Sequence, residues 1–291
     1  MADGYRPSPR PTFDSPTVIP MAQATRHVWG DAESGEVLDR IYVSSGQIHQ
    51  LLFEIPAGGE FRHSADFRTI FGADEVLYVV EGTVAFADPA AGEVVRAAAG
   101  EAVFFRRDTW HHAFNWGPGP ARVLEFFAPP PATGASGSYA QQQPLLTGSR
   151  YADDAVLGRH VPGAAPAPAA RRFAVIRETD YRWRLDGDRD PVLIGLLAST
   201  EHLTVARGEV RAAGWSGWLG HEGDASGYVL AGSLLLRHTG ASEREWHQLG
   251  PGDGFFVPES ARYQLRNGSG DRAVYLVGAA PSYGPGTCSP A

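Results

Sequence analysis

The sequence predicts an all-β protein built from two similar halves, and three observations support this prediction. Short runs of alternating apolar and polar residues, separated by Gly, Pro and Asp turns, fill two long stretches, as in LYVVEG (77–82) and AVYLVG (273–278). No segment shows a 3.6-residue apolar period over about ten positions, so helices are not expected to form the core. The stretch from Glu75 to Asn115 also has a counterpart about 150 residues later.

The internal repeat aligns residue by residue. EVLYVVEG (75–82) is echoed by GYVLAG (227–232), which places Gly232 in the position of Gly82. GEAVFFRRDTWHHAFN (100–115) matches GDGFFVPESARYQLRN (252–267), which places Asn267 in the position of Asn115. Two units of this size predict two similar barrels rather than a solenoid.

The chain of 291 residues, 43% of them hydrophobic, has room for two such cores. We expect a flexible Pro-rich arm (1–25), an N-terminal barrel (26–130), a Pro/Ala/Gly-rich linker (131–170) with a short helix around 151–157, a C-terminal barrel (171–285) and a tail (286–291). The arm is expected to be disordered or to lie on a partner.

Composition excludes several classes of function. All 25 basic residues are Arg, so there is no lysine for a Schiff base, for pyridoxal phosphate or for a P-loop. A net charge of −8 argues against nucleic acid and anionic membranes as partners, and no apolar run reaches the length of a membrane span. The single cysteine, Cys288, allows no intrachain disulfide, and the N-terminus lacks the apolar segment of a secretory signal, so a cytoplasmic location is expected.

The repeated stretch carries the chemistry. On a strand, residues i and i+2 share a face, so Glu75 lies on the side of Leu77 and Val79, and His111 on the side of Asn115. A carboxylate and an imidazole pointing into a barrel from two strands form the core of a metal site.

These residues resemble the motifs of the cupin family. Glu75 and Gly82 fit the end of its first motif, and Gly100, His111 and Asn115 fit its second, in which Arg106 and Asp108 replace a Pro and a Gly. The second half fits through Gly252, Pro258 and Asn267. The resemblance implies two tandem double-stranded β-helix barrels, a bicupin, and a homodimer because cupin edge strands invite pairing.

The family also supplies a His-x-His pair just before the Glu. Here that pair falls on Arg68 or Thr69 and Ile70 or Phe71, which cannot bind a metal. We therefore take His63, moved by a loop insertion, with Glu75 and His111 as the expected metal ligands; Asp66 is a weaker candidate than His63. Two histidines and one carboxylate suit Fe(II), with Mn(II), Ni(II) or Zn(II) as alternatives. The competing interpretation is a metal-free remnant in which Glu75 and His111 are hydrogen-bonded.

His112 is expected to point away from the cavity, since neighbours on a strand face opposite ways, unless a bulge makes it the ligand. In the second barrel Ala225 and Tyr263 replace the Glu and the His, and one imidazole, His221, remains. We expect this degenerate site, His221 with Tyr263, to be empty of metal.

Aromatic residues cluster around the first motif pair and favour a small apolar or aromatic substrate. The expected substrate-binding residues are Phe104, Trp110, Asn115 and Arg106, the last as a clamp for an anion.

Two classes of function compete. The first is a metal-dependent enzyme with Glu75 and His111 as catalytic residues, most simply a dioxygenase, with an isomerase, cyclase or decarboxylase as the alternative. The second is a non-catalytic bicupin that binds a small molecule or a protein. Retention of Glu75 and His111 in one barrel favours the enzyme.

Overall fold

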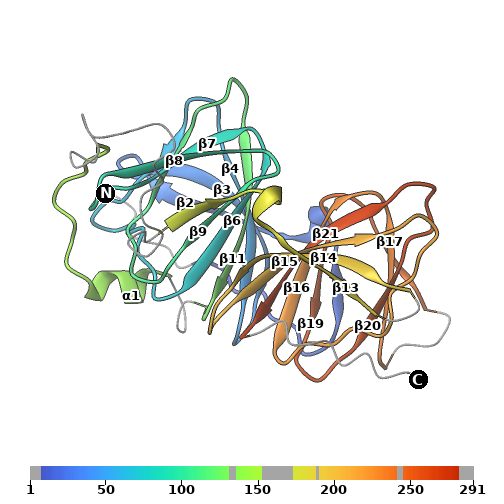
Figure 1. Cartoon of the computed structure of the whole chain (residues 1–291). Coiled ribbons are helices and arrows are strands. Elements are labelled where there is room, and N and C mark those ends of the chain that lie inside the picture. The colour runs from blue at the N-terminus through green and yellow to red at the C-terminus, as the bar shows by residue number, and fades with distance from the viewer. Residues whose placement is uncertain (1–7, 131–135, 153–172, 188–189, 241–244, 282–291) are drawn as a thin grey trace.

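The computed structural model describes residues 8–130, 136–152, 173–187, 190–240 and 245–281, and it contains two β-barrels side by side (Figure 1). Each barrel pairs a seven-stranded antiparallel sheet with a smaller sheet. The all-β class and the two-barrel architecture predicted from the repeat are therefore confirmed.

In the N-terminal barrel, the large sheet has the order β12-β9-β6-β11-β4-β3-β2 and the small sheet β5-β10-β7-β8. Its strands are β2 (Thr25–Asp31), β3 (Gly35–Ser44), β4 (His49–Ile55), β5 (Glu60–Phe61), β6 (Asp74–Glu81), β7 (Thr83–Asp88), β8 (Glu93–Ala98), β9 (Ala102–Phe105), β10 (His112–Asn115), β11 (Ala121–Ala128) and β12 (Phe173–Ile176).

The C-terminal barrel repeats this plan, with the large sheet ordered β1-β19-β16-β21-β15-β14-β13 and the small sheet β18-β17-β20. Its strands are β1 (Thr17–Ile19), β13 (Arg182–Asp186), β14 (Val192–Ser199), β15 (Thr204–Val210), β16 (Asp224–Ala231), β17 (Leu234–His238), β18 (His247–Leu249), β19 (Gly254–Val257), β20 (Tyr263–Arg266) and β21 (Ala273–Ala280).

The two halves exchange one edge strand each. β1, from the N-terminal arm, pairs with β19 of the C-terminal barrel, and β12, which precedes the C-terminal barrel in sequence, pairs with β9 of the N-terminal barrel. Two of the expected assignments are therefore corrected. From residue 8 onward the arm lies against its own chain rather than being flexible, and residues 173–176 belong to the N-terminal barrel. This pairing was not predictable from the sequence, because the strand in the arm has only three residues and the Pro residues around it are atypical of strands.

The conformation of the turns explains why glycine recurs at the same position in both halves. Gly82 and Gly232 each follow a strand with φ of +89° and +78°, and a Cβ there would meet the Cα of Ala121 at 3.0 Å and of Ala273 at 2.8 Å. Asp108, which replaces a motif glycine, also has a positive φ, +62°, a conformation that Asp tolerates better than most residues. The motif conformation is thus kept although the glycine is lost.

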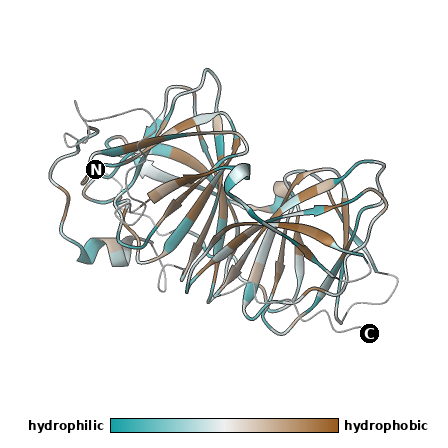
Figure 2. Ribbon diagram, viewed as in Figure 1, coloured by the Kyte–Doolittle hydropathy of each residue, from teal (hydrophilic) through white to brown (hydrophobic). Residues whose placement is uncertain are grey.

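Each barrel has its own core, and a third apolar cluster joins the two barrels. Figure 2 shows hydrophobic residues concentrated on the strands of both barrels. The joining cluster lies between the large sheets and includes Tyr42, Phe126, Tyr228 and Leu276. The hydroxyl of Tyr42 donates to the carbonyl oxygen of Gly252 at 2.6 Å, so a polar contact also crosses the interface.

The linker is partly structured. Helix α1 (Ser136–Gln142) lies against the N-terminal barrel, where Arg68 donates to the carbonyl oxygens of Ala140 and Gln143 at 3.2 and 2.8 Å. Residues 153–157 of the helix expected around 151–157, and the tail with Cys288, lie outside the described residues. None of the described helices is long and apolar enough to span a membrane.

Candidate active site

The N-terminal barrel contains a narrow cavity of about 70 Å³, and the N-terminal arm contributes to its wall. The wall is mostly apolar and aromatic, with a few ionisable groups among the rings. The lining residues are Ser8, Arg10, Trp29, Val37, Asp39, Ser44, His49, Leu51, Phe53, Phe61, Thr69, Phe71, His111, Glu125 and Phe127. A space of this size and polarity suits a small organic molecule.

Strand alternation delivers two carboxyl groups to the barrel interior. Along β6 the odd-numbered residues Glu75, Leu77 and Val79 face inward, whereas the even-numbered ones face the other barrel. β11 pairs with β6 in the register Glu125 to Leu77, so Glu125 and Phe127 face the same interior. Glu125 lines the cavity and Glu75 lies behind it, and both are almost fully buried.

A side-chain hydrogen bond joins Glu75 to Glu125, and we call these two residues the carboxyl pair. Burial raises the pKa of Glu125 to about 7. Burial, and then the charge of Glu125, raise the pKa of Glu75 well above its ordinary range. The interaction with Glu125 raises the pKa of Glu75, whereas the same hydrogen bond lowers the pKa of Glu125, so Glu75 is the member that keeps a proton more strongly.

His111 stands directly before β10 and lines the cavity beside the carboxyl pair. Its Nδ1 lies 3.3 Å from the carbonyl oxygen of Thr109, so Nδ1 carries the proton and Nε2 has a lone pair. Nε2 is 3.6 Å from Oε2 of Glu75, an oxygen that has no hydrogen-bond partner in the described part of the chain. Burial lowers the pKa of His111 to about 4, so the ring is neutral at physiological pH.

The cavity contains two further ionisable groups that the sequence reading did not identify. Asp39 on β3 is buried, and its pKa is raised well above the ordinary range by burial and by the charge of Glu125. His49 at the start of β4 has its pKa lowered to about 3 by burial and by the charge of Arg10. Burial therefore favours the neutral form of both groups.

The two positions where the family places its His-x-His pair are occupied by Thr69 and Phe71. Both line the cavity, and the carbonyl oxygen of Thr69 accepts a hydrogen bond from the backbone nitrogen of His111 at 3.0 Å. The ring of Phe71 lies 5.5 Å from that of His111, measured between centroids. An apolar ring thus fills space that a second imidazole would need.

His63 does not join Glu75 and His111. Its Nδ1 lies 2.7 Å from Nε2 of His112, and its Nε2 lies 2.8 Å from the carbonyl oxygen of Leu146. The other ring nitrogen of His112, Nδ1, lies 3.0 Å from the hydroxyl of Tyr151. The loop insertion therefore moves His63 to the linker side of β10, where His112 also points. His112 is buried there rather than on the surface.

The described residues do not fit a divalent metal held by three protein ligands. In the part of the chain that the structure describes, no three His, Cys, Asp or Glu side chains are grouped to hold an ion. The expected ligand set of His63, Glu75 and His111 is corrected accordingly: Glu75 and His111 face each other, and His63 lies elsewhere.

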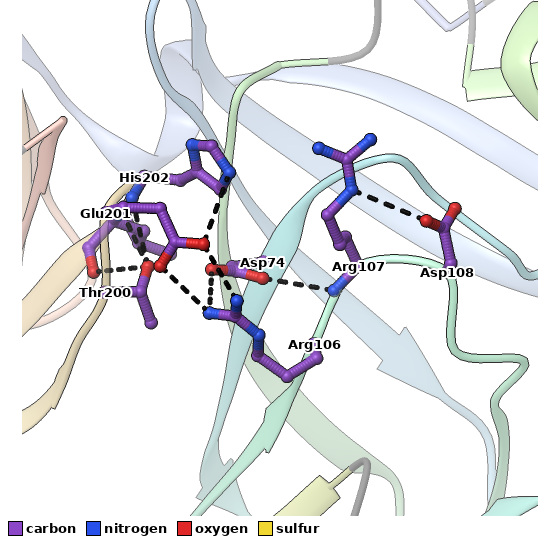
Figure 3. Close-up of polar contacts among 8 residues, drawn as sticks. Asp74, Arg106, Arg107, Asp108, Thr200, Glu201 and His202 are labelled. Atoms are coloured by element: carbon purple, nitrogen blue, oxygen red, sulfur yellow. Dashed lines mark hydrogen bonds and ion pairs between the residues drawn. The ribbon is translucent and has the colours of Figure 1, made fainter.

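Arg106 is not at the cavity. Its guanidinium lies 3.0 Å from Asp74 and 2.8 Å from Glu201 of the other half, as Figure 3 shows. The backbone nitrogen of Arg107 also donates to Asp74. The charges of Asp74 and Glu201 orient Arg106 toward the junction of the barrels, so it serves as an inter-barrel contact rather than an anion clamp.

The other expected substrate-binding residues also lie outside the cavity. Phe104, as an even-numbered neighbour of Phe105 on β9, packs toward the inter-barrel cluster. Trp110 packs beneath α1, with its ring 4.9 Å from that of His63. Asn115 donates from Nδ2 to the carbonyl oxygens of residues 55, 56 and 119, at 3.0, 2.9 and 2.8 Å, and so holds turns together.

In the C-terminal barrel the degenerate pair is brought together. Nε2 of His221 lies 3.1 Å from the hydroxyl of Tyr263, which is fully buried in the core. Ala225, at the position of Glu75, is also buried. The pair provides one imidazole and one phenol, a poor donor set for a metal.

The sequence contained signals for some of the cavity residues that the motif analysis did not identify. Glu125 interrupts the apolar run RVLEFFA (122–128), and a charged residue on the inward face of a strand is itself informative. Asp39 likewise lies within β3, and His49 directly precedes the apolar residues of β4. Arg10 had no such signal, because only the folded arm brings it to the barrel.

Comparison with known proteins agrees with this fold. A family model described as a cupin domain matches residues 52–127, which include the carboxyl pair and His111. No curated protein matches the sequence. Among solved structures, a protein from Pseudomonas aeruginosa named for induction by glyoxylate matches with a TM-score of 0.64 and 16% identity over 96% of both chains.

Two further structures have the same architecture. A single-residue mutant of oxalate decarboxylase from Bacillus subtilis matches with a TM-score of 0.60 and 11% identity over 93% of this chain and 78% of that one. Procruciferin, an 11S globulin from Brassica napus, matches with a TM-score of 0.58 and 11% identity over 93% and 85%. Residues 52–127 thus match the cupin domain, and the chain as a whole has the two-barrel fold of these structures. At these identities the similarity concerns the fold alone.

Proposed function

We propose that the N-terminal barrel is the active site of an enzyme that moves a proton within a small organic substrate, as an isomerase or cyclase does. The observation that supports this most directly is the row Glu125, Glu75, His111. Its two ends line one cavity, and its middle member lies buried behind them. A row of this kind takes a proton at one point and returns one at another.

The proton balance is simple. Ionised Glu125, which accepts the hydrogen bond from Glu75, takes a proton from a substrate carbon or hydroxyl and becomes a neutral acid. It then returns that proton to a second substrate atom, while Glu75 keeps its own proton and Nε2 of neutral His111 accepts a hydrogen bond from the substrate. No electron is transferred and no co-reactant is consumed. A pKa of about 7 for Glu125 suits a general base at neutral pH.

The rest of the cavity supports this chemistry by excluding water. Phe53, Phe61, Phe71 and Phe127 enclose the substrate space and keep the local dielectric low. This setting strengthens the one hydrogen bond that a protonated Asp39 donates to a developing oxyanion.

A second candidate is the metal-dependent enzyme, dioxygenase or other, that the motif resemblance implies. One observation favours it: Oε2 of Glu75, without a hydrogen-bond partner in the described part of the chain, faces Nε2 of His111 at 3.6 Å, and both are metal-type donors. Thr69 and Phe71 at the other two ligand positions weigh against it. Fe(II) would have two protein ligands here, fewer than its usual three.

The test of proton transfer is hydrogen–deuterium exchange. Pyruvate and phenylpyruvate are incubated with the full chain in D2O, and loss of their carbon-bound proton signals is followed by NMR. We expect the wild type to accelerate exchange and Glu125→Gln to lower the rate by about 100-fold or more, because the base is lost. Glu81→Gln, which changes an exposed carboxylate at the end of β6, should leave the rate unchanged. Equal rates in the wild type and Glu125→Gln would rule out Glu125 as the base.

A further inference from the structure

Four of the residues that line the cavity of the N-terminal barrel are also partly exposed, and they mark the place where the cavity meets solvent. Two of them, Trp29 and Phe71, belong to the barrel, and the other two, Ser8 and Arg10, belong to the N-terminal arm. The other described residues of the wall are buried. The arm therefore forms one side of the rim, and a molecule that enters there has to pass it.

The barrel side of the rim is fixed by packing among aromatic rings. The ring of Trp29 lies 5.9 Å from that of Phe61 and 5.3 Å from that of Phe67, measured between centroids. The ring of Phe71 lies 5.9 Å from that of Phe127. Both rim residues are thus held by the barrel itself, and moving them would disturb its core.

The arm side of the rim is attached in a different way. The pairing of β2 with β3 stops at Ile41, so the last residues of β3 are left without a partner from β2. The arm takes this place: the carbonyl oxygen of Pro11 accepts from the backbone nitrogen of Ser44 at 2.7 Å, and Nε of Arg10 donates to the hydroxyl of Ser44 at 3.0 Å. Pro9 and Pro11 have no N–H group, so this part of the arm cannot donate a continuous ladder of hydrogen bonds to β3.

Beyond the cavity the arm crosses to the other barrel. The ring of Phe13 lies 6.2 Å from that of Phe256 on β19, and it packs against the apolar cluster that joins the barrels. A few residues later, β1 pairs with β19. Residues 8–11 thus extend from a fixed point on the C-terminal barrel to the cavity of the N-terminal barrel.

We propose that residues 8–11 form a lid over the cavity, that small molecules enter when this lid leaves Ser44, and that Phe13 anchors the lid on the C-terminal barrel. Opening breaks the hydrogen bonds with Ser44 and leaves the packed rings of the barrel side in place, as is typical of segments of low local stability. Because proline fixes φ, the lid moves as a stiff piece. The C-terminal barrel thereby controls access to the cavity of its neighbour, whatever reaction takes place there.

Entry is measured with a thiol placed in the cavity. All proteins carry Cys288→Ser, so the introduced cysteine is the only thiol of the chain. The cavity reporters are Val37→Cys on β3 and Leu51→Cys on β4, and the reference is Val192→Cys, which is fully buried in the core of the C-terminal barrel. Each protein is treated with methyl methanethiosulfonate, a small uncharged thiol reagent, and labelling is followed by mass spectrometry.

Two substitutions in the full chain loosen the lid at different points. Arg10→Ala removes the side-chain bond with Ser44, and Phe13→Ala removes the ring contact with Phe256 without changing a residue of the cavity wall. Arg26→Ala is the matched control, because Arg26 is an exposed arginine of β2 that does not line the cavity.

We expect the cavity cysteines to react about tenfold or more faster in Arg10→Ala and about threefold or more faster in Phe13→Ala than with the native arm. Arg26→Ala should leave their rates unchanged, and Val192→Cys should react at the same slow rate in all of these proteins. The inference is overturned if Arg10→Ala and Phe13→Ala leave the labelling of both cavity cysteines unchanged. It is also overturned if they accelerate Val192→Cys by the same factor, because the substitutions would then act on the stability of the whole chain.

Discussion

Asn115→Ala is expected to lower the free energy of unfolding by about 3 kcal/mol or more. The Nδ2 of Asn115 donates to three carbonyl oxygens, and its Oδ1 accepts from the backbone nitrogen of Gly117 at 3.0 Å. Alanine removes all four bonds and leaves carbonyl groups at the strand ends without this partner. Urea denaturation gives the change directly.

The second barrel provides a matched comparison. Asn267 donates to the carbonyl oxygens of residues 210, 211 and 271 at 3.0, 3.2 and 2.7 Å, so Asn267→Ala should cost a similar amount. The neighbouring Trp116 is 70% exposed, and Trp116→Ala should change stability by less than about 1 kcal/mol. If Asn115→Ala were as mild as Trp116→Ala, Asn115 would not be the brace described here, and a role in substrate binding would return.

The second large effect is a pH-dependent gain in stability in Glu125→Gln. Burial raises the pKa of Glu125 from its ordinary 4.5 to about 7, so the folded state favours the protonated form. The stability that this group contributes is complete below pH 4.5 and is lost as the pH rises to about 7. Glutamine does not ionise, and therefore the variant should gain on the wild type across this range, by up to about 3 kcal/mol at neutral pH.

The measurement is the difference in unfolding free energy between the two proteins at several pH values from 4 to 8. His49 and His111 have lowered pKa values, so the stability that they contribute is present above pH 6.5. It is lost as the pH falls toward 4 for His111 and toward 3 for His49. They are common to both proteins and cancel in the difference. A difference that does not change with pH would mean that Glu125 has an ordinary pKa, and the carboxyl pair would lose its role as a proton store.

The fold was predictable because the repeat and the strand alternation are local signals. Glu75, Leu77 and Val79 share the inward face as expected, and the glycine turns and motif asparagines recur in both halves. The exchange of edge strands was not predictable, since the three residues of β1 carry no pairing signal that distinguishes one barrel from the other. The homodimer and the cytoplasmic location stay predictions.

The site was only partly predictable, because it depends on which loop or arm reaches which wall. The facing of His111 against His112 follows from alternation, whereas the position of His63 depends on an inserted loop of unknown path. Arg106 was chosen for its place in the motif, but the partner that orients it, Glu201, is 95 residues away in sequence. Arg10 reaches the cavity only through the fold of the arm.

The most direct test of the central claim, that a protonated carboxyl pair replaces the metal centre in this barrel, is the Mn(II) content of the full chain. The protein is prepared without a histidine tag or chelator and measured after equilibration with Mn(II), beside Thr69→His/Phe71→His, which restores imidazoles at the two family positions. We expect the wild type to retain well below one ion per chain and the double variant to approach one, bound through Glu75 and His111. Stoichiometric metal in the wild type that is lost in Glu75→Ala and His111→Ala would contradict the account.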